Sequence, residues 1–593
     1  MTKMKEIKAD GASYSRTIIL QWFKRLLPAQ ILASATAALG SIINGLVVGN
    51  CLPAEAMVAL GFVVPMTAML GAIATVISGG GRIMCGQYMG RGELEKLNDV
   101  FSATIVLSVG VGAVLTVVGL AFSVPLARLF GAAGETTAAT AEYIRGLALG
   151  FIPTLLVPGL MVLLQMVNQI GYAFASSLVL AGAGLVGGLL NVKVFHGGIF
   201  GMGVANSAAQ GITMLFLLLR FVRKKNLMRP GKVKGNGELY RKMLVLGSPA
   251  ALATVLYAVR NVVINSLGLR WGGTEAVSSL AILNSAMGPF DAVNVGLGAT
   301  ALILASIFAG EKDNKSMELL LKTSVKVGLL CAFAKVALLA VGGKWLAMLF
   351  GARGALASDA YLLIILYSLC MPLNMIVATL VSAHQALGRV KMSNVVYVFS
   401  AFVFPLAWAF LTGYFVNLTA MWLLYAVAEV LTLALLAGIC WKQRGHFPRT
   451  AADWLWMEKP GEAHKFSLSL HEMDQVLTVS EQLVDFCRTH GIDDRRSKLC
   501  GLCAEEMAGN VVAHGFTKSK RKDLVVDLFA CCDGNQVTVR IRDNAPAFDP
   551  HTKLGAFDPE DPCKNVGIRM VASMAKEMNY QTCFGLNVLS IKL

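Results

Sequence analysis

Three polar side chains near the C-terminal end of the sequence, Glu506, Asn510 and His514, are spaced four residues apart. In a helix this spacing places them on one face. A carboxylate beside an amide on a rigid helix is suited to hold a metal ion and to orient a water or hydroxyl group. Solvated helix faces often show the same spacing, so the neighbouring elements decide whether this helix has such a role.

The chain downstream of this helix supplies two further groups. A strand ends in RDNAPAFDP (542–550), a loop rich in Pro, Asp and Gly follows, and NVGIRMV (565–571) opens a helix. Asp543 at the strand end is placed to accept a hydrogen bond from the amino group of adenine. Gly567 lets backbone amides at a helix N-terminus approach phosphate. Together these elements predict a nucleotide site.

The order of these elements resembles the ATP-binding fold shared by histidine kinases, gyrase, the Hsp90 chaperone and bacterial anti-sigma-factor serine kinases. The resemblance spans residues 463–593 and is nearest to the anti-sigma kinases. It implies ATP and Mg²⁺ as cofactors. By matching position it implies Glu506 as the catalytic base, Asn510 as the magnesium ligand, Asp543 as the adenine contact and Gly567 as the phosphate-binding glycine after a short lid.

The loop after Asp543 departs from that fold, because it reads NAPA (544–547) where glycines are usual. Nucleotide binding is expected to survive, since Asp543 is kept. Three outcomes stay open: an ATP-dependent serine/threonine protein kinase, simple ATP hydrolysis, and a degenerate domain that only docks on the rest of the chain. His514 and Gly515 match an HG pair of the anti-sigma kinases and are expected to be structural. A histidine kinase is not expected, because no helix pair with a phospho-acceptor His precedes the domain.

Residue periodicity predicts the elements that carry these groups. KFSLSL (465–470) alternates like a strand, and helical patterns follow over 471–489 and 494–515. Two strands joined by DGN (533–535) read as a hairpin. A last helix over 567–578 precedes a terminal strand. Helices on one face of a mostly antiparallel sheet make an α+β sandwich.

The rest of the chain has the composition of a membrane protein. Of 593 residues, 55% are hydrophobic and only 15% are charged, and the mean hydropathy is +0.63. We count about twelve apolar runs, each long enough to cross about 30 Å of hydrocarbon as a helix. LASATAAL (32–39) after a basic start could be read as a signal-peptide cleavage site, but apolar sequence continues to about Val48 and favours an uncleaved first helix.

These patterns predict an all-α polytopic membrane protein with a C-terminal α+β sandwich. The expected parts are a cytoplasmic N-terminus (1–26), a first membrane lobe of six spans (27–222), a basic cytoplasmic loop (223–243), a second lobe of six spans (244–445), a linker (446–462) and a cytoplasmic ATP-binding domain (463–593).

The net charge of +16 is concentrated in loops, most densely over residues 220–242, rather than on one soluble face. Nucleic acid is therefore not an expected partner. By the positive-inside rule that loop and the basic N-terminus are cytoplasmic, and an even number of spans brings the C-terminus to the same side. We expect a multi-pass protein of the bacterial cytoplasmic membrane. The twelve cysteines show no zinc-ligand spacing and are expected to be reduced core residues.

The membrane half repeats itself about 220 residues later. EAMVAL (55–60) returns as EAVSSL (275–280), Gly90 returns as Gly310, and the stretch LFGAAG returns as LFGARG. IIN, ending at Asn44, returns as VIN, one residue out of step. An offset of six spans predicts two parallel repeats related by an axis along the membrane normal, with a substrate cavity between them.

Residues 20–445 resemble the multidrug and toxic-compound extrusion family, within the larger group that includes lipid-linked oligosaccharide flippases. IINGLVVGN, ISGGGRIMCGQYMGRGE (77–93) and ANSAAQG (205–211) carry the resemblance. It implies export of cationic or amphipathic compounds in exchange for protons or sodium ions, with membrane lipid around the spans. Asn44 stands where many members have an acidic residue, and asparagine can coordinate a cation but cannot take up a proton near neutral pH.

Ionisable side chains within spans are costly and are functional candidates by default. The transport-cavity candidates are Asn44, Asn265, Asp291, Glu429 and Arg260. A simpler interpretation is that Arg260 pairs with Asp291 or Glu429 to satisfy charge. Another intramembrane base, the lysine of span nine, is expected to extend to a membrane edge or to have a function.

The leading hypothesis is an exporter driven by an ion gradient and regulated by ATP occupancy or kinase activity of its tail. Direct ATP-driven pumping is not favoured, because no GxxxxGK[ST] loop is present. The rival hypothesis is a membrane receptor whose tail phosphorylates a serine of a soluble, anti-anti-sigma-like (STAS-like) partner. A lipid-linked substrate flippase is a third.

Overall fold

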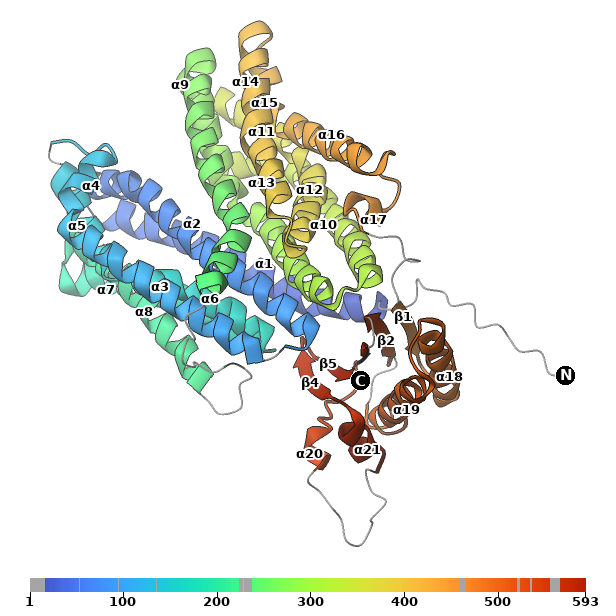
Figure 1. The fold of residues 1–593 in the computed structure, drawn as a ribbon. Coiled ribbons are helices and arrows are strands. Elements are labelled where there is room, and N and C mark those ends of the chain that lie inside the picture. Colours follow the sequence, from blue (N-terminus) through green and yellow to red (C-terminus); the bar gives the residue numbers. More distant parts are fainter. Residues whose placement is uncertain are drawn as a thin grey trace. The chain divides into compact units, whose positions relative to one another are not determined.

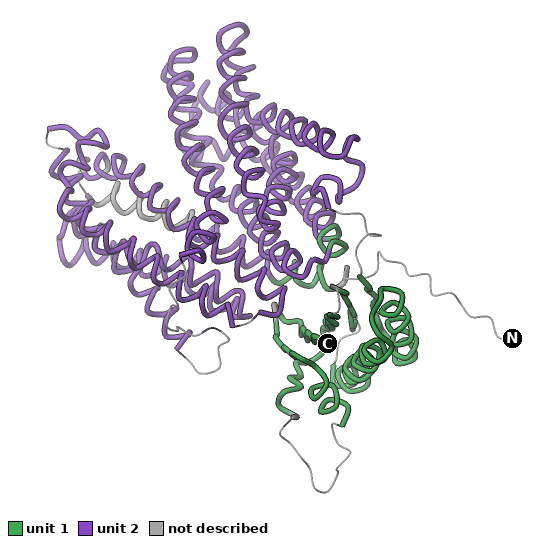
Figure 2. The backbone as a smooth tube through the Cα atoms, in the orientation of Figure 1, with its two compact units in different colours: residues 1–25, 314–319, 458–593 green, residues 26–313, 320–457 purple. Residues whose placement is uncertain are grey.

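The computed structural model describes residues 16–52, 54–93, 95–134, 136–222, 228, 237–457, 465–519, 523–533, 536–554 and 566–593. Most of the expected basic loop, the end of the expected linker and the expected lid lie outside these ranges. The chain forms two compact units (Figure 2). The first unit contains residues 1–25, 314–319 and 458–593, and the second contains residues 26–313 and 320–457.

The second unit is helical (Figure 1). Two of its helices, α1 and α10, begin in the first unit. The elements are α1 (Arg16–Cys51), α2 (Ala54–Arg91), α3 (Glu95–Ala121), α4 (Ser123–Leu129), α5 (Thr136–Ala148), α6 (Phe151–Met166), α7 (Ile170–Leu190), η1 (Asn191–Phe195), α8 (Gly198–Val222), α9 (Gly237–Glu311), α10 (Asn314–Leu349), α11 (Ala355–Ser368), α12 (Cys370–Ala386), α13 (Val390–Val398), η2 (Phe399–Val403), α14 (Phe404–Phe415), α15 (Leu418–Trp422), α16 (Leu424–Arg444) and α17 (Ala451–Trp454).

Within the described ranges, 9 helices are long and apolar enough to cross a membrane, or up to 10 with the bent pair α5–α6. Helix α9 has 75 residues and contains Gly273 at φ 62° and ψ −158°, so it is two helices joined at a kink. Helix α1 is a further long apolar helix of 36 residues. With α9 taken as two spans, these helices fit the twelve spans expected from hydropathy.

The two sequence repeats meet at their equivalent glycines. A Cβ atom on Gly90 of α2 would lie 2.1 Å from the Ile307 carbonyl oxygen, and one on Gly310 of α9 would lie 2.2 Å from the Gln87 carbonyl oxygen. No larger side chain fits at either position. The backbones of α2 and α9 can approach this closely only because both repeats keep glycine at the crossing.

The first unit contains a five-stranded antiparallel sheet in the order β1-β2-β3-β5-β4. Its helices α18, α19 and α21 pack on one face over a buried core that includes Leu470, Val479, Ile541 and Ile591. This is the expected α+β sandwich. The elements are β1 (Lys465–Leu470), α18 (Met473–Thr489), α19 (Asp494–Asn510), η3 (Val511–Gly515), β2 (Val526–Asp533), β3 (Gln536–Asp543), α20 (His551–Leu554), α21 (Val566–Met574), β4 (Glu577–Cys583) and β5 (Leu586–Lys592).

One element of the sandwich differs from the prediction. The last helix was expected to run to residue 578, but α21 ends at Met574 and residues 577–583 form the edge strand β4. Phe584 and Gly585 have φ of 50° and 78° and make a two-residue turn into β5. Positive φ at both central residues matches the twist of a hairpin, and the strand was missed because few of its side chains are apolar.

The expectation of reduced core cysteines is confirmed for the cysteines whose side chains are described, which are free and mostly buried. In the first unit, Cys487, Cys500 and Cys503 are fully buried. Burial raises the pKa of the Cys503 thiol to about 12. A buried thiol with a raised pKa is inert, so these residues act as small apolar side chains.

Candidate functional site

The first unit brings Glu506 and Gly567 into direct contact. Glu506 lies on α19, and Gly567 is the second residue of α21. A Cβ atom on Gly567 would lie 1.8 Å from Glu506 Oε2. Gly567 therefore leaves space for the Glu506 carboxylate at the start of α21. The sequence analysis explained this glycine by the approach of phosphate and did not predict its contact with Glu506.

Asn510, at the end of α19, is half-buried one turn after Glu506. The chain then widens into the π-helical turn η3, and such turns are frequent at functional sites. No group of three His, Cys, Asp or Glu residues that could hold a metal occurs in the ranges described. Mg²⁺ usually takes few protein ligands and completes its shell with water and phosphate, so Asn510 beside Glu506 fits such an ion. His514 is exposed.

Asp543, at the end of β3, is 5% exposed. Its Oδ1 accepts hydrogen bonds from the Ala545 backbone N–H at 2.9 Å and from Asn587 Nδ2 at 2.8 Å. Burial raises the pKa of the Asp543 carboxyl to about 6, and the two hydrogen bonds partly oppose this shift. Both bonds to described residues use Oδ1, which leaves Oδ2 available to an amino group.

Two buried asparagines that sequence reasoning missed position Asp543. Asn587 on β5 also donates to the Ala545 carbonyl at 3.0 Å and accepts from the Tyr580 hydroxyl at 2.9 Å. Asn544 accepts from the Val525 N–H at 2.9 Å and so joins the loop to the start of β2. No spacing rule finds these residues, because their partners come from separate strands. The lid expected before Gly567 lies outside the described residues.

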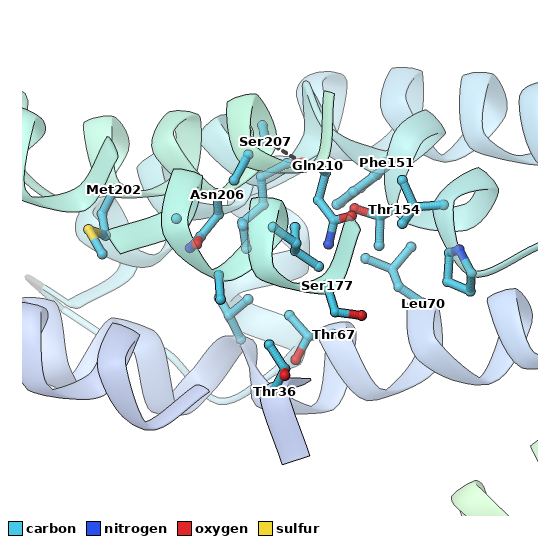
Figure 3. Close-up of a pocket in the computed structure, with 18 of the residues that line it drawn as sticks. Thr36, Thr67, Leu70, Phe151, Thr154, Ser177, Met202, Asn206, Ser207 and Gln210 are labelled. Carbon is cyan, nitrogen blue, oxygen red and sulfur yellow. Dashed lines mark hydrogen bonds between the residues drawn. The ribbon is translucent and has the colours of Figure 1, made fainter. Parts of the chain in front are cut away.

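The second unit contains a cavity of about 570 Å³ in its first lobe. It lies among helices α1, α2 and α5 to α8, and Figure 3 shows its polar side chains pointing inward from several of them. Within the described part of the chain its lining carries no Asp, Glu, Lys or Arg. The polar lining residues are Thr36, Thr67, Tyr143, Thr154, Ser177, Asn206, Ser207 and Gln210.

Most hydroxyl groups of the cavity are already bonded within the protein. Ser207 Oγ donates to the Gly146 carbonyl at 2.8 Å, and Thr67 Oγ1 donates to the Val64 carbonyl at 2.9 Å. The Ser177 hydroxyl is buried and has no hydrogen-bond partner among the described residues. A buried polar group without a partner is costly, so Ser177 is the group in this lining that gains most from a ligand.

Of the two candidate asparagines, Asn265 is not a residue of this lining. The backbone of Asn44 lies in α1, but its side chain falls outside the described residues. Asn265 is exposed on α9. The structure thus gives neither residue a described contact that would make it a cation ligand.

The second lobe instead has a buried network of polar and charged side chains. Lys335 on α10, 5% exposed, donates to the Phe290 carbonyl at 3.3 Å and to Asn294 Oδ1. Asn294 Nδ2 donates to Asn374 Oδ1 at 3.5 Å, and Asn374 Nδ2 donates to Glu429 Oε1 at 2.7 Å. These bonds connect Lys335 to Glu429 through two amides. The expectation that this lysine extends to a membrane edge is therefore wrong.

Two further candidates border the network. Asp291 accepts from the Tyr367 hydroxyl, at 3.3 Å to each carboxylate oxygen. Arg260 stacks on the rings of Tyr257 and Tyr425, at 4.8 and 5.2 Å from the ring centroids. Within the ranges described, Arg260 makes no direct ion pair with either acid, so the expected contact is wrong, but Arg260 still interacts electrostatically with both carboxylates. Glu429 Oε2 is buried and has no hydrogen-bond partner among the same residues.

Comparison with known proteins supports both halves of this description. The MatE family model matches residues 29–191 and 249–411, which together make more than half of the chain. The chain belongs to the MatE family. A second model, the histidine kinase-like ATPase domain, matches residues 471–593 of this MatE protein. The resemblances stated from the sequence are confirmed.

Two curated relatives of this MatE protein come from bacteria. The probable multidrug resistance protein YoeA of Bacillus subtilis is 22% identical over 70% of this chain and 92% of its own length. The multidrug export protein MepA of Staphylococcus haemolyticus is 25% identical over 42% of this chain and 56% of its own length.

Solved MATE structures share the fold. An outward-facing MATE transporter aligns with a TM-score of 0.68 at 17% identity, over 75% of this chain and 98% of its own. A MATE structure in complex with MaL6 aligns with a TM-score of 0.67 at 18% identity, over 73% and 98%.

The two family matches start at 29 and 249 and end at 191 and 411, which sets their offset at 220 residues. At this offset three lining residues of the first cavity correspond to residues that belong to the second-lobe network or contact it. The corresponding pairs are Leu70 and Phe290, Leu147 and Tyr367, and Thr154 and Asn374. The same positions therefore line an uncharged cavity in one lobe of the MatE protein and a charged network in the other.

Proposed function

We propose that this MatE protein exports amphipathic small molecules, binds them in the first-lobe cavity and draws on an ion gradient through the second-lobe network. The observation that carries the proposal is the correspondence between the two sites. One repeat has about 570 Å³ of space and no charged lining among the described residues. The other has a buried base, Lys335, and a buried acid, Glu429, that are connected through two amide side chains.

The cavity favours an uncharged form of the substrate. Ligand cavities of about 300–1,000 Å³ accommodate drug-sized molecules. A cation buried there would lose its hydration and would meet only hydroxyl, amide and aromatic groups from the described residues. The Ser177 hydroxyl and the Gln210 amide offer hydrogen bonds to a neutral polar group. Two relatives named for multidrug resistance and multidrug export support a drug-like substrate.

The second lobe is where we place ion coupling. Glu429 is 8% exposed, and one of its carboxylate oxygens is free of hydrogen bonds to the described residues. A buried carboxylate that gains and loses a counter-charge changes the energy of its lobe by several kcal/mol, on the order of 3–5 kcal/mol when a buried partner is removed. Such a change is sufficient to shift the equilibrium between two conformations.

We further propose that ATP occupancy of the C-terminal domain regulates export through α1 and α10. Residues 16–25 and 314–319 belong to the same unit as the ATPase domain. Within that unit Gln21 Nε2 donates to Asp523 Oδ2 at 2.8 Å, and Lys315 Nζ donates to Ser467 Oγ at 3.3 Å. Helix α1 continues to Thr36 in the first cavity. Both helices continue from these contacts into the second unit; Pro28 lies inside α1 between Gln21 and Thr36, so α10 is the less interrupted route for a regulatory signal.

We propose as a second candidate activity phosphotransfer to a serine of a soluble STAS-like partner, supported by the position of Glu506. Glu506 lies against the start of α21, where phosphates would bind, and is therefore placed to accept a proton from an attacking hydroxyl. ATP is a cytoplasmic solute, so we place the first unit on the cytoplasmic side of the membrane. Loss of phosphotransfer in Glu506→Gln with unchanged transport would identify this activity.

Export into inverted membrane vesicles tests the leading proposal. Uptake of an uncharged amphipathic fluorescent dye is followed under an imposed proton or sodium gradient, first without nucleotide and then with ATP. We expect uptake to follow the ion gradient without ATP and to change in rate when ATP is added. Asp543→Asn should remove the ATP response and leave the basal rate unchanged, whereas Asp485→Asn, at an exposed acid of α18, should alter neither. Strict dependence on ATP hydrolysis would contradict the proposal.

A further inference from the structure

The Lys335 side chain lies among oxygen atoms of the kind that ligate alkali-metal ions. Its ammonium donates to a backbone carbonyl, that of Phe290, and to the side-chain oxygen of Asn294. Asp291 follows Phe290 in the chain and interacts electrostatically with Lys335. A carbonyl, an amide oxygen and a nearby carboxylate are hard oxygen donors, which suit small hard cations.

The charges around this position balance without any bound ion. Arg260 and Lys335 are the bases, and Asp291 and Glu429 are the acids. The hydroxyl groups that face them are those of Tyr257, Tyr367 and Tyr425. A sodium ion added to this neutral buried cluster would be an uncompensated charge, which is strongly unfavourable in a low-dielectric interior.

We infer that the Lys335 ammonium is a resident cation in an oxygen-lined position of the second lobe that would otherwise suit an alkali-metal ion, so that this lobe does not bind sodium. The inference rests on the proposed ion coupling and narrows the choice of coupling ion, because it excludes sodium from the second lobe. The corresponding residue of the first repeat, 220 positions earlier, is the apolar Leu115. Of these two equivalent positions, only that of the second lobe therefore carries a positively charged side chain. We infer that Lys335 determines which ion the second lobe accepts.

Removal of the charge should create a sodium site. In Lys335→Met the cluster keeps two carboxylates and one base, and the oxygens of Phe290 and Asn294 lose their donor. A sodium ion then restores both the charge balance and the coordination. Lys335→Arg keeps the positive charge in a larger group and should exclude sodium as the wild-type protein does.

Binding of radioactive sodium to the purified full-length protein, with no substrate present, tests this inference. We expect wild type, Lys335→Arg and the exposed-lysine control Lys326→Met to show no saturable binding over a potassium background. Lys335→Met should show one saturable class of site and a melting temperature that rises in sodium chloride relative to choline chloride. Asp291→Asn added to Lys335→Met should remove both effects.

Saturable sodium binding to the wild-type protein would overturn the inference, and this arm does not depend on the folding of any variant. Folded, monodisperse Lys335→Met without sodium binding would overturn it as well. The sodium-binding result is independent of the export result that tests the proposed function. A protein that exports nothing under any gradient can still be shown to bind sodium or not to bind it.

Discussion

The two lobes of this MatE protein descend from one repeat but differ in what they bury. The first lobe buries a cavity with hydroxyl and amide groups, and the second buries Lys335, Asn294, Asn374 and Glu429 in one hydrogen-bonded network. Thr154 and Asn374 stand at equivalent positions. The difference teaches that the two repeats of one scaffold can differ in burial, with an uncharged cavity in one lobe and charged side chains in the other.

The largest effect on gradient-driven uptake is expected from a substitution of Glu429, which would remove one of the charges that distinguish the second-lobe network from the first-lobe cavity. Glu429→Gln keeps the shape of the side chain but removes the charge that balances the bases of the second lobe. Because loss of one member of a buried charged network costs roughly 3–5 kcal/mol, gradient-driven uptake should fall by at least about tenfold. Uptake in inverted vesicles measures the effect. Glu275→Gln, an exposed acid on α9, is the matched control and should transport normally.

Acid pH should also act on the nucleotide domain, through Asp543. The pH dependence of nucleotide affinity must therefore be measured separately before a pH effect on export is assigned to either lobe. Asp543 has a pKa raised to about 6 by burial, so it is protonated in the folded domain as pH falls through 6. A protonated carboxyl accepts hydrogen bonds poorly, and affinity for an ATP analogue should be about tenfold weaker at pH 5 than on the plateau above pH 7. Asp543→Asn should bind weakly at every pH. An equally steep pH dependence in Asp543→Asn would show that another group titrates.

A smaller effect is expected in the first lobe, at Ser177. Ser177→Ala removes a buried hydroxyl that has no partner within the described residues, so stability should be unchanged or higher. If the hydroxyl bonds to the substrate, affinity for the dye should fall about fivefold, the value of one neutral hydrogen bond. Fluorescence titration and a melting curve measure the two quantities. Ser176→Ala is the control, because Ser176 donates to the Ala173 carbonyl at 2.7 Å and is not a lining residue.

The smallest effect concerns regulation. Lys315→Met removes an exposed hydrogen bond to Ser467 at the start of the helix that carries Lys335. Exposed contacts of this kind contribute little, so the response of export to ATP should fall by about twofold while nucleotide affinity stays constant. An unchanged response in Lys315→Met and in Gln21→Ala together would remove α10 and α1 as the regulatory route.

Much of this architecture could be predicted from the sequence. Hydropathy identifies the spans, and strict alternation in KFSLSL predicts β1 with its observed bounds, Lys465–Leu470. The repeat also locates Gly90 and Gly310, which the structure brings together. These features are local or periodic, so a single sequence contains them.

The chemistry inside each lobe could not be predicted in the same way. Lys335 bonds to groups of α9, and the network reaches Glu429 through α12, so its members lie up to 135 residues apart in sequence (Asn294 to Glu429). Sequence reasoning named Arg260, Asp291 and Glu429 as ionisable residues but paired them incorrectly. It missed Ser177 and Asn587, because a hydroxyl or amide becomes distinctive only when the fold buries it.

The central claim is that the first lobe binds substrate and the second lobe binds charge. The most direct test reconstitutes wild type, Ser177→Ala and Glu429→Gln in liposomes and measures equilibrium dye affinity and gradient-driven accumulation in the same preparations. The account predicts that Glu429→Gln keeps wild-type affinity and loses accumulation, while Ser177→Ala loses affinity and still accumulates dye in response to the gradient when dye is saturating. Loss of dye affinity in Glu429→Gln, with full accumulation retained at saturating dye, would contradict it.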